Sequence, residues 1–204
     1  MEKVSFNRLP EDFEADIEVF EKEIAANKAG ETSDLNFKVA RVARGIYEHR
    51  QHGRFMMRVR IPGGGLTAVQ TRKIAELGMR YGNRLHITDR QDVQIHDIDL
   101  DNCPRILREL YTVNLSSKGG GGNTVRNVTA CSAAGVCAKE AFDVAPYAVA
   151  LTDFMMTDPL SHTGKLPRKY KIAFSGCGDD CAFATVNDLG CIAKTKTVDG
   201  GEIQ

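Results

Sequence analysis

Hydrophobic and polar residues follow two different periods along the first half of the chain. Residues 11–30 carry apolar side chains at helical spacing and end at a glycine, which predicts a helix whose charged face lies on the surface. Residues 54–61, RFMMRVRI, are rich in β-compatible types and end at the turn PGGG, which predicts a strand. A helix over 67–82 follows, with Thr67 as its N-cap and Gly82 as its stop. Strands are then expected in RLHIT and DVQIHDIDL, and a helix in NCPRILRELYTV. This order predicts one α+β unit of about seventy residues.

The second half begins with SSKGGGGNT, residues 116–124. This run is too glycine-rich for packed secondary structure, so we expect a linker or a loop that closely approaches a ligand. A helix around 138–156, a strand in YKIAFSG and a terminal strand with a hairpin turn follow. The sequence thus predicts a helical surface appendage over 1–50, an α/β unit over 51–117 and a second α/β domain over 118–204. That second domain is expected to be incomplete at its C-terminal end.

Charge and composition exclude several classes of protein. Lys and Arg total 27 against 27 Asp and Glu, so nothing in the overall charge indicates nucleic acid or an anionic membrane. No apolar run approaches the ~18 residues of a spanning helix, and the N-terminus lacks the apolar core of a secretory signal. We therefore expect a cytoplasmic protein with reduced thiols, in which six cysteines indicate metal ligands or core residues.

Four of the cysteines form two pairs: Cys131 and Cys137 as C-x5-C, and Cys177 and Cys181 as C-x3-C. Structural zinc usually takes tighter pairs, and a thioredoxin-type site requires C-x-x-C. Iron–sulfur clusters accept four thiolates at variable spacings. Buried core thiols are the plain alternative, because free cysteine is often buried. Spacing alone leaves cluster, core and zinc open, whereas the remaining two cysteines, Cys103 and Cys191, fit core positions.

Several basic residues occur within predicted strands or beside the cysteines. Arg58 and Arg60 alternate with apolar residues, and Arg90 lies between two strands. Taken singly, each fits a solvated strand face. Arg126, however, lies shortly before the first cysteine pair, and Lys169 and Lys171 alternate in the strand that leads to the second pair. A positive wall beside a cluster suits an oxyanion or a carboxylate-rich cofactor.

Four segments, in order, resemble the siroheme-dependent sulfite and nitrite reductases. They are MMRVRIPGGG, ITDRQDVQIHDI, NTVRNVTAC with its C-x5-C, and LPRKYKIAFSGCGDDCAF with its C-x3-C. The resemblance covers roughly residues 54–193 and implies a ferredoxin-like α/β half-domain followed by a siroheme- and [4Fe-4S]-binding α/β domain. It implies sulfite reduction to sulfide, with nitrite reduction to ammonia as the alternative, and an electron-donor protein such as a ferredoxin or flavoprotein.

The resemblance also assigns roles to individual residues. It implies that Cys131, Cys137, Cys177 and Cys181 hold a [4Fe-4S] cluster, with Cys181 also bridging to the siroheme iron. The residues expected to bind the anion and supply protons are Arg58, Arg126, Lys169 and Lys171. The residues expected to contact siroheme are Arg60, Arg90, Gln94, His96, Thr124 and Asn127.

The sequence departs from the family pattern in three respects, one of which is that it stops where the family continues, so we expect a fragment of a longer reductase or an unusually short single-half enzyme. The second cysteine motif usually reads C-P-N-x-C, whereas here Gly178 and Asp179 occupy the proline and asparagine positions. Larger members have two pseudo-symmetric halves with siroheme at their junction, and this chain has one half, so we expect a second copy or a partner to complete the pocket. An Fe–S electron-transfer domain without siroheme is the alternative of a different class.

Overall fold

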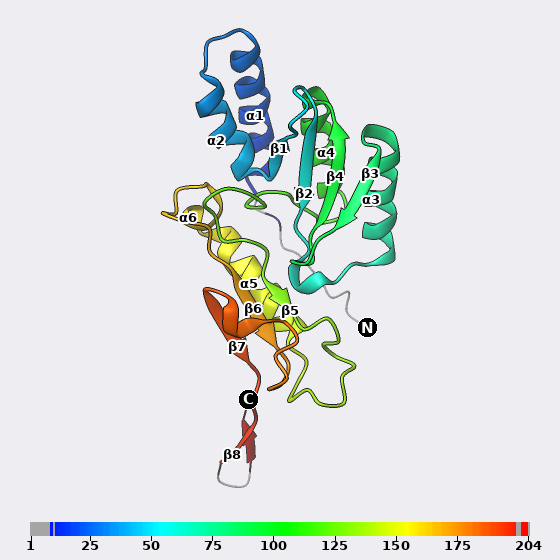
Figure 1. The fold of residues 1–204 in the computed structure, drawn as a ribbon, viewed down its shortest axis with the longest axis vertical. Coiled ribbons are helices and arrows are strands. Elements are labelled where there is room, and N and C mark those ends of the chain that lie inside the picture. The colour runs from blue at the N-terminus through cyan, green and yellow to red at the C-terminus, as the bar shows by residue number, and fades with distance from the viewer. Residues whose placement is uncertain (1–8, 10, 199–200, 204) are drawn as a thin grey trace.

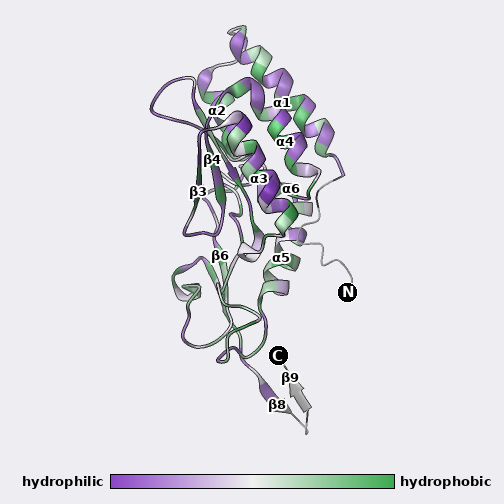
Figure 2. Cartoon of the chain, turned by 90° about the vertical axis from the view of Figure 1, so that its right-hand side faces the viewer, coloured by the Kyte–Doolittle hydropathy of each residue, from purple (hydrophilic) through white to green (hydrophobic). Residues whose placement is uncertain are grey.

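The computed structural model of the chain describes residue 9, residues 11–198 and residues 201–203. Its first half is a four-stranded antiparallel sheet in the order β1-β2-β4-β3, with helices on one face (Figures 1 and 2). The strands are β1 Ile46–Glu48, β2 Phe55–Val59, β3 Arg84–Ile87 and β4 Val93–Ile98. The helices are α1 Phe13–Lys28, α2 Asp34–Ala43, α3 Ala68–Tyr81 and α4 Cys103–Tyr111.

The elements expected between residues 54 and 113 are confirmed, and their local causes are visible. Thr67 caps α3 through a capping box with Gln70, in which each side chain satisfies a backbone N–H of the other residue. Strand β2 alternates buried and half-buried residues, so Met57 and Val59 face the helices while Arg58 faces away from them. The same alternation that buries the apolar side chains therefore places Arg58 on the open face of the sheet.

The N-terminal helix is part of the main core, which corrects the expectation of a surface appendage. Ile17, Phe20 and Ile24 of α1 are buried in one cluster with the apolar residues of the sheet, α3 and α4. Strand β1, which follows α2, pairs with β2 and adds an edge to the same sheet. The charged pattern identified the exposed face of α1 correctly, but the opposite face packs on the domain.

The glycine-rich loop is packed against the first domain rather than extended as a linker. A Cβ on Gly121 would meet the Val42 carbonyl oxygen and, at 2.5 Å, Tyr47 Oη. The hydroxyl of Tyr47 accepts a hydrogen bond from Gly122 N at 3.1 Å. The glycines allow this loop to approach the backbone between α2 and β1, so the close approach is to the chain itself.

The second half contains a three-stranded parallel sheet in the order β5-β6-β7 and a separate hairpin of β8 and β9. Its strands are β5 Thr129–Ala130, β6 Ile172–Ser175, β7 Leu189–Ile192, β8 Lys196–Val198 and β9 Gly201–Ile203, and its helices are α5 Ala145–Thr157 and α6 Pro159–His162. Helix α5 begins later than the expected residue 138, because residues 131–144 form the loop that carries the first cysteine pair. A second apolar cluster, drawn from residues 125–193, forms the core of this half.

Candidate functional site

A cavity of about 730 Å³ is lined by residues from both halves of the chain. Its walls include the loop between β3 and β4, the segment before β5, the segment before β6 and the loop after the second cysteine pair. Six residues predicted from the sequence line it together: Arg58, Arg90, Arg126, Lys169, Lys171 and Cys181. The four side chains expected to bind an anion thus share one cavity with the cysteine expected to bridge the cofactors.

The cationic side of the cavity is set by backbone pairing between two distant segments. Val125 forms a parallel bridge with Tyr170, and Arg126 N donates to Tyr170 O at 2.8 Å. Lys169 and Lys171 flank Tyr170 and, by strand alternation, extend to the same side. In the described part of the chain, neither lysine nor Arg126 forms an ion pair with a carboxylate. These three cations are therefore available to an anionic ligand.

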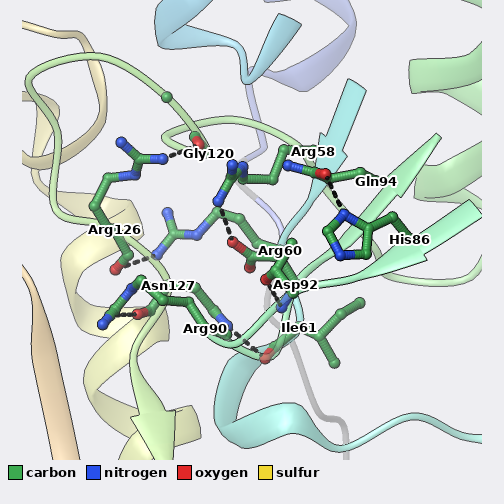
Figure 3. Close-up of polar contacts among 12 residues, drawn as sticks. Arg58, Arg60, Ile61, His86, Arg90, Asp92, Gln94, Gly120, Arg126 and Asn127 are labelled. Carbon is green, nitrogen blue, oxygen red and sulfur yellow. Dashed lines mark hydrogen bonds and ion pairs between the residues drawn. The ribbon is translucent and has the colours of Figure 1, made fainter. Parts of the chain in front are cut away.

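Arg58 lines the cavity, whereas its partner Asp92, which lies next to it (Figure 3), does not. Arg58 Nη1 is 3.5 Å from Asp92 Oδ2, and the Asp92 side chain is only 3% exposed. Burial raises the pKa of Asp92, and the nearby arginines oppose this effect. Asp92 was not among the residues identified from the sequence, although its place in ITDRQDVQ between Arg90 and Gln94 could have indicated it.

Arg90 connects the two halves of the chain. Its guanidinium donates to Asn127 O at 2.7 Å and to Asn187 Oδ1 at 3.0 Å, and both acceptors belong to the second half. Burial lowers its pKa, and Asp92 opposes this. The neighbouring Gln91 side chain forms two hydrogen bonds with the backbone of Ala130. Its Nε2 donates to Ala130 O at 2.7 Å, and its Oε1 accepts from Ala130 N at 3.0 Å. These contacts hold the β3–β4 loop against the second half, where it forms part of the cavity wall.

Three residues expected to contact siroheme lie buried behind this wall. Arg60 is 2% exposed, and its guanidinium contacts the Lys118 carbonyl at 3.2 Å and Met156 Sδ at 3.0 Å. Burial lowers the pKa of Arg60 to about 10, so it remains charged at neutral pH. Thr124 Oγ1 donates within the glycine loop, and Asn127 Nδ2 donates to Ile61 O at 2.8 Å. In this structure all three organise backbone around the cavity and do not line it.

Gln94 and His96 occupy the open face of the sheet beside Arg58. Gln94 is opposite both Arg58 and His86 in the strand register, and its Oε1 is 3.0 Å from His86 Nδ1. His96 Nε2 is 3.2 Å from the same oxygen. Burial lowers the pKa of His96, and the charge of Arg84 lowers it further. This polar face adjoins the cavity, but neither residue lines it.

The four paired cysteines lie on two loops that are joined to each other. Ala141 N donates to Gly176 O at 2.8 Å, and Lys139 Nζ is 2.8 Å from Asp179 Oδ2. The Cys181 side chain is exposed, and its pKa is raised first by desolvation and then by the charges of Cys131, Cys177, Asp179 and Cys137, so the four thiols act on one another. Within the described residues, no three ligand side chains are gathered as around a single metal ion.

The two remaining cysteines have different surroundings. Cys103 is fully buried in the first core, and burial raises the pKa of its thiol. Cys191 is half-buried in β7. The core position expected for Cys103 is confirmed.

Two family models match consecutive parts of the chain. Residues 47–113 match the nitrite/sulfite reductase ferredoxin-like half domain, and residues 121–201 match the nitrite and sulphite reductase 4Fe-4S domain. The chain belongs to the nitrite and sulfite reductase family. The expected fold class, a ferredoxin-like half-domain followed by a cluster-binding domain, is confirmed.

Relatives in this family are longer than the chain. The assimilatory ferredoxin-dependent nitrite reductase of Haloferax mediterranei is 34% identical over 170 residues, which are 76% of this chain and 28% of that protein. The ferredoxin–nitrite reductase of Synechococcus elongatus is 38% identical over 141 residues, covering 67% of this chain and 28% of that protein. The structure of the Mycobacterium tuberculosis NirA protein matches with a TM-score of 0.70 and 28% identity, over 85% of this chain and 35% of that one. The chain thus spans about 28% of the length of these two curated relatives.

The CGDDC loop, which stands where the nitrite and sulfite reductases usually have C-P-N-x-C, is held by Asp180. The Asp180 carboxylate accepts hydrogen bonds from Ser175 Oγ at 2.5 Å, Ala184 N at 2.7 Å, and Thr185 N and Oγ1 at 3.1 and 2.6 Å. These hydrogen bonds lower the pKa of Asp180. Asp179 instead extends to Lys139 at the surface. Asp180 therefore fastens the loop to β6 and to the turn that follows it, a role the sequence alone did not identify.

None of the helices in the described part of the chain combines the length and apolar character that a bilayer span requires.

Proposed function

We propose that this chain forms the anion-binding and electron-delivering part of a siroheme-dependent nitrite or sulfite reductase. The observation that supports this best is the cavity in which Arg58, Arg126, Lys169 and Lys171 meet Cys181. We propose nitrite rather than sulfite as the substrate, because the two relatives compared above are named as nitrite reductases. Their names also support a ferredoxin as the electron donor.

The cysteine loops fit a [4Fe-4S] cluster. Four thiols on two connected loops match the ligand set of such a cluster, and small residues surround them. The side chain of Cys181 also belongs to the wall of the cationic cavity. A cluster held there would lie next to the anion site, which is where electrons are needed.

The cavity also fits siroheme, which carries eight carboxylates. Five cationic side chains line it, and the Nε atoms of Arg58 and Arg90 have no hydrogen-bond partner among the described residues. Siroheme, when bound, would supply the iron at which the anion is reduced. The residues that would hold its carboxylates are Arg90 and, from the adjoining face of the sheet, Gln94 and His96, with Cys181 next to its iron. We further propose that a second copy of the chain or a partner half completes the pocket.

The chemistry of the protein side chains follows from their charges and positions. Reduction of nitrite to ammonia or of sulfite to sulfide consumes protons and releases oxygen as water. Arg58 and Arg126 offset the charge of the anion and orient it, while Lys169 and Lys171 hold protons that they donate as the N–O or S–O bonds break. The partly enclosed cavity strengthens these interactions because fewer water molecules compete for the anion.

Iron content and the optical spectrum test this proposal. The full chain, purified anaerobically and supplied with iron, sulfide and siroheme, is expected to contain about four cluster irons plus one siroheme iron and to show a Soret band. Cys177→Ser should lose cluster iron, whereas Cys191→Ser, which changes a half-buried thiol outside the two pairs, should retain it. A chain that binds no iron would refute the proposal. The ratio of turnover with nitrite to turnover with sulfite then identifies the substrate.

An electron-transfer domain that binds the cluster without siroheme is the second candidate. Retention of all four anion-site cations in one cavity argues against it. A protein with cluster absorbance that takes up no siroheme would favour this candidate. The cytoplasmic location expected from the sequence stays a prediction.

A further inference from the structure

One buried carboxylate, Asp92, lies among four arginines (Figure 3), three of which line the cavity. The side chain of Asp92 is 3% exposed, and the positive charges that act on it come from Arg58, Arg60, Arg126 and Arg90. A buried charge is normally paired and fully hydrogen-bonded. Here Asp92 Oδ1 has no hydrogen-bond partner among the described residues, and its other oxygen has only Arg58 at 3.5 Å. The hydrogen bonding of the buried Asp92 carboxylate is thus incomplete.

The charge around Asp92 is also unbalanced. Arg60 is buried and the other three arginines are half-buried, yet Asp92 is the only buried carboxylate among the described residues near them. Arg60, Arg90 and Arg126 satisfy part of their donors with backbone carbonyls, which carry no full charge. Among the residues that the structure describes, Arg58 has no such carbonyl partner, and its ion pair is with Asp92. The orientation of Arg58 therefore depends on this one carboxylate.

The backbone at Asp92 is held firmly enough to serve as an anchor. Asp92 N donates to Thr88 Oγ1 at 3.1 Å, and Thr88 N donates to Asp92 O at 2.9 Å. Immediately afterwards Val93 enters β4, where it pairs with both Val59 and Ile87. The carboxylate is thus fixed at the start of a central strand, directly below the side chain that reaches into the cavity.

We propose that Asp92 is a positioning residue of the anion site, which holds the Arg58 guanidinium toward the cavity and supplies one compensating negative charge beneath it. This inference rests on the proposed function in one respect, namely that the cavity binds an anion. Asp92 itself does not line the cavity, so it acts through Arg58.

Two opposite expectations separate this role from a simple charge effect. If only the total charge mattered, Asp92→Asn would remove a negative charge near the site and strengthen binding of nitrite. If Asp92 positions Arg58, the same substitution releases the guanidinium from its anchor and weakens binding. We expect roughly tenfold weaker binding, which corresponds to the loss of one charge-assisted hydrogen bond.

A double-mutant cycle measures this directly. Nitrite binding is titrated by calorimetry on the full chain, with cofactor content matched among the wild type, Asp92→Asn, Arg58→Gln and the double variant. Asp92→Asn should weaken binding in the wild-type background and have no further effect when Arg58 is already replaced. Asp99→Asn is the matched control, because it removes an exposed carboxylate just beyond the other end of β4, where its partner is Arg54 at 2.7 Å. That variant should bind nitrite like the wild type.

Each outcome of the cycle decides the matter. Tighter binding by Asp92→Asn, or an equal loss in both backgrounds, overturns the positioning role. If Asp92→Asn is too unstable to purify, the urea midpoint of the double variant replaces the titration. A double variant as stable as Arg58→Gln supports the pairing, and one that also fails to fold overturns it. A wild-type chain that binds neither nitrite nor sulfite refutes the proposed function, whereas absence of coupling in a chain that binds nitrite refutes only the role of Asp92.

Discussion

Replacing Gly121 by alanine tests whether the glycine loop is a packed element of the anion site. The backbone of Gly121 does not have a positive φ, so alanine can adopt its conformation and the effect is steric. The new Cβ would meet the Val42 carbonyl and Tyr47 Oη, which lie on a helix end and a strand. Neither neighbour is the free end of a flexible chain, because Val42 O accepts from Gly45 N at 2.9 Å and Tyr47 Oη accepts from Gly122 N. The loop itself must therefore move, by roughly 1 Å, to restore ordinary contact distances.

The cost of this movement can be worked out from its parts. Overpacking by one methyl group costs about 1–3 kcal/mol, and loss of the Gly122–Tyr47 hydrogen bond adds about 0.5–1.5 kcal/mol. The alanine also lowers the conformational entropy of the unfolded chain, which offsets about 0.4–1 kcal/mol of this destabilisation. The net destabilisation is about 2 kcal/mol, which for a chain of this size lowers Tm by about 4–8 °C. Since Arg126 Nη2 donates to Gly120 O at 2.8 Å, the displaced loop should also weaken anion binding.

Thermal unfolding followed by circular dichroism measures the effect, with Gly178→Ala as the matched control. A Cβ on Gly178 would meet nothing within 4 Å, and that residue too lacks a positive φ. The control should unfold within about 2 °C of the wild type or slightly above it. If Gly121→Ala unfolds at the wild-type temperature, the loop is not packed as described and the reasoning fails.

Two further predictions concern the cysteine loop and the response to acid. Asp180→Ala removes the acceptor of four hydrogen bonds and should lower the free energy of unfolding in urea by about 1–3 kcal/mol. The control Asp179→Ala breaks only an exposed ion pair and should lower it by less than about 1 kcal/mol. Equal losses of stability in the two variants would contradict the role assigned to Asp180. The pKa of His162 is lowered by burial and then by Lys118 and Arg60, so the unfolded chain takes up a proton near pH 6.5 that the folded chain does not. The free energy of unfolding should therefore fall as the pH drops below about 6.5, and His162 contributes at most about 1.4 kcal/mol per pH unit to this fall. Urea midpoints measured across this pH range should decline less steeply for His162→Gln than for the wild type.

Local patterns were enough to place most elements of the first half. The apolar periodicity and the capping signal at Thr67 are properties of neighbouring residues, and they define α3 without reference to the rest of the chain. The alternation around Arg58 likewise settles which face of β2 it occupies. The cysteine spacings and the four family motifs identified the cluster-binding domain, because ligands in such motifs keep their order along the chain.

Contacts between distant segments were beyond the reach of those patterns. A helix with one apolar stripe, such as α1, can cover its own domain or a partner, and the choice depends on the shape of the opposing surface. The glycines of residues 116–124 have no side chains to indicate a neighbour, and it was the backbone of residues 42–47 that required them. Helix α5 begins late for a similar reason, since residues 131–144 are needed for the cysteine loop.

The charged residues show most clearly where sequence information ends. Residue types and spacing indicated which arginines and lysines belong near the cysteines, because anion chemistry requires positive charge whatever the fold. Whether a given arginine lines the cavity or lies behind it depends on what packs around it. Arg58 and Arg60 are two residues apart on the same face, yet Arg58 reaches the cavity and Arg60 is buried against Met156. Burial and pairing with Asp92 arise only when β2, β4 and the second half come together, and the free energy of a buried charge is set by that assembled surrounding.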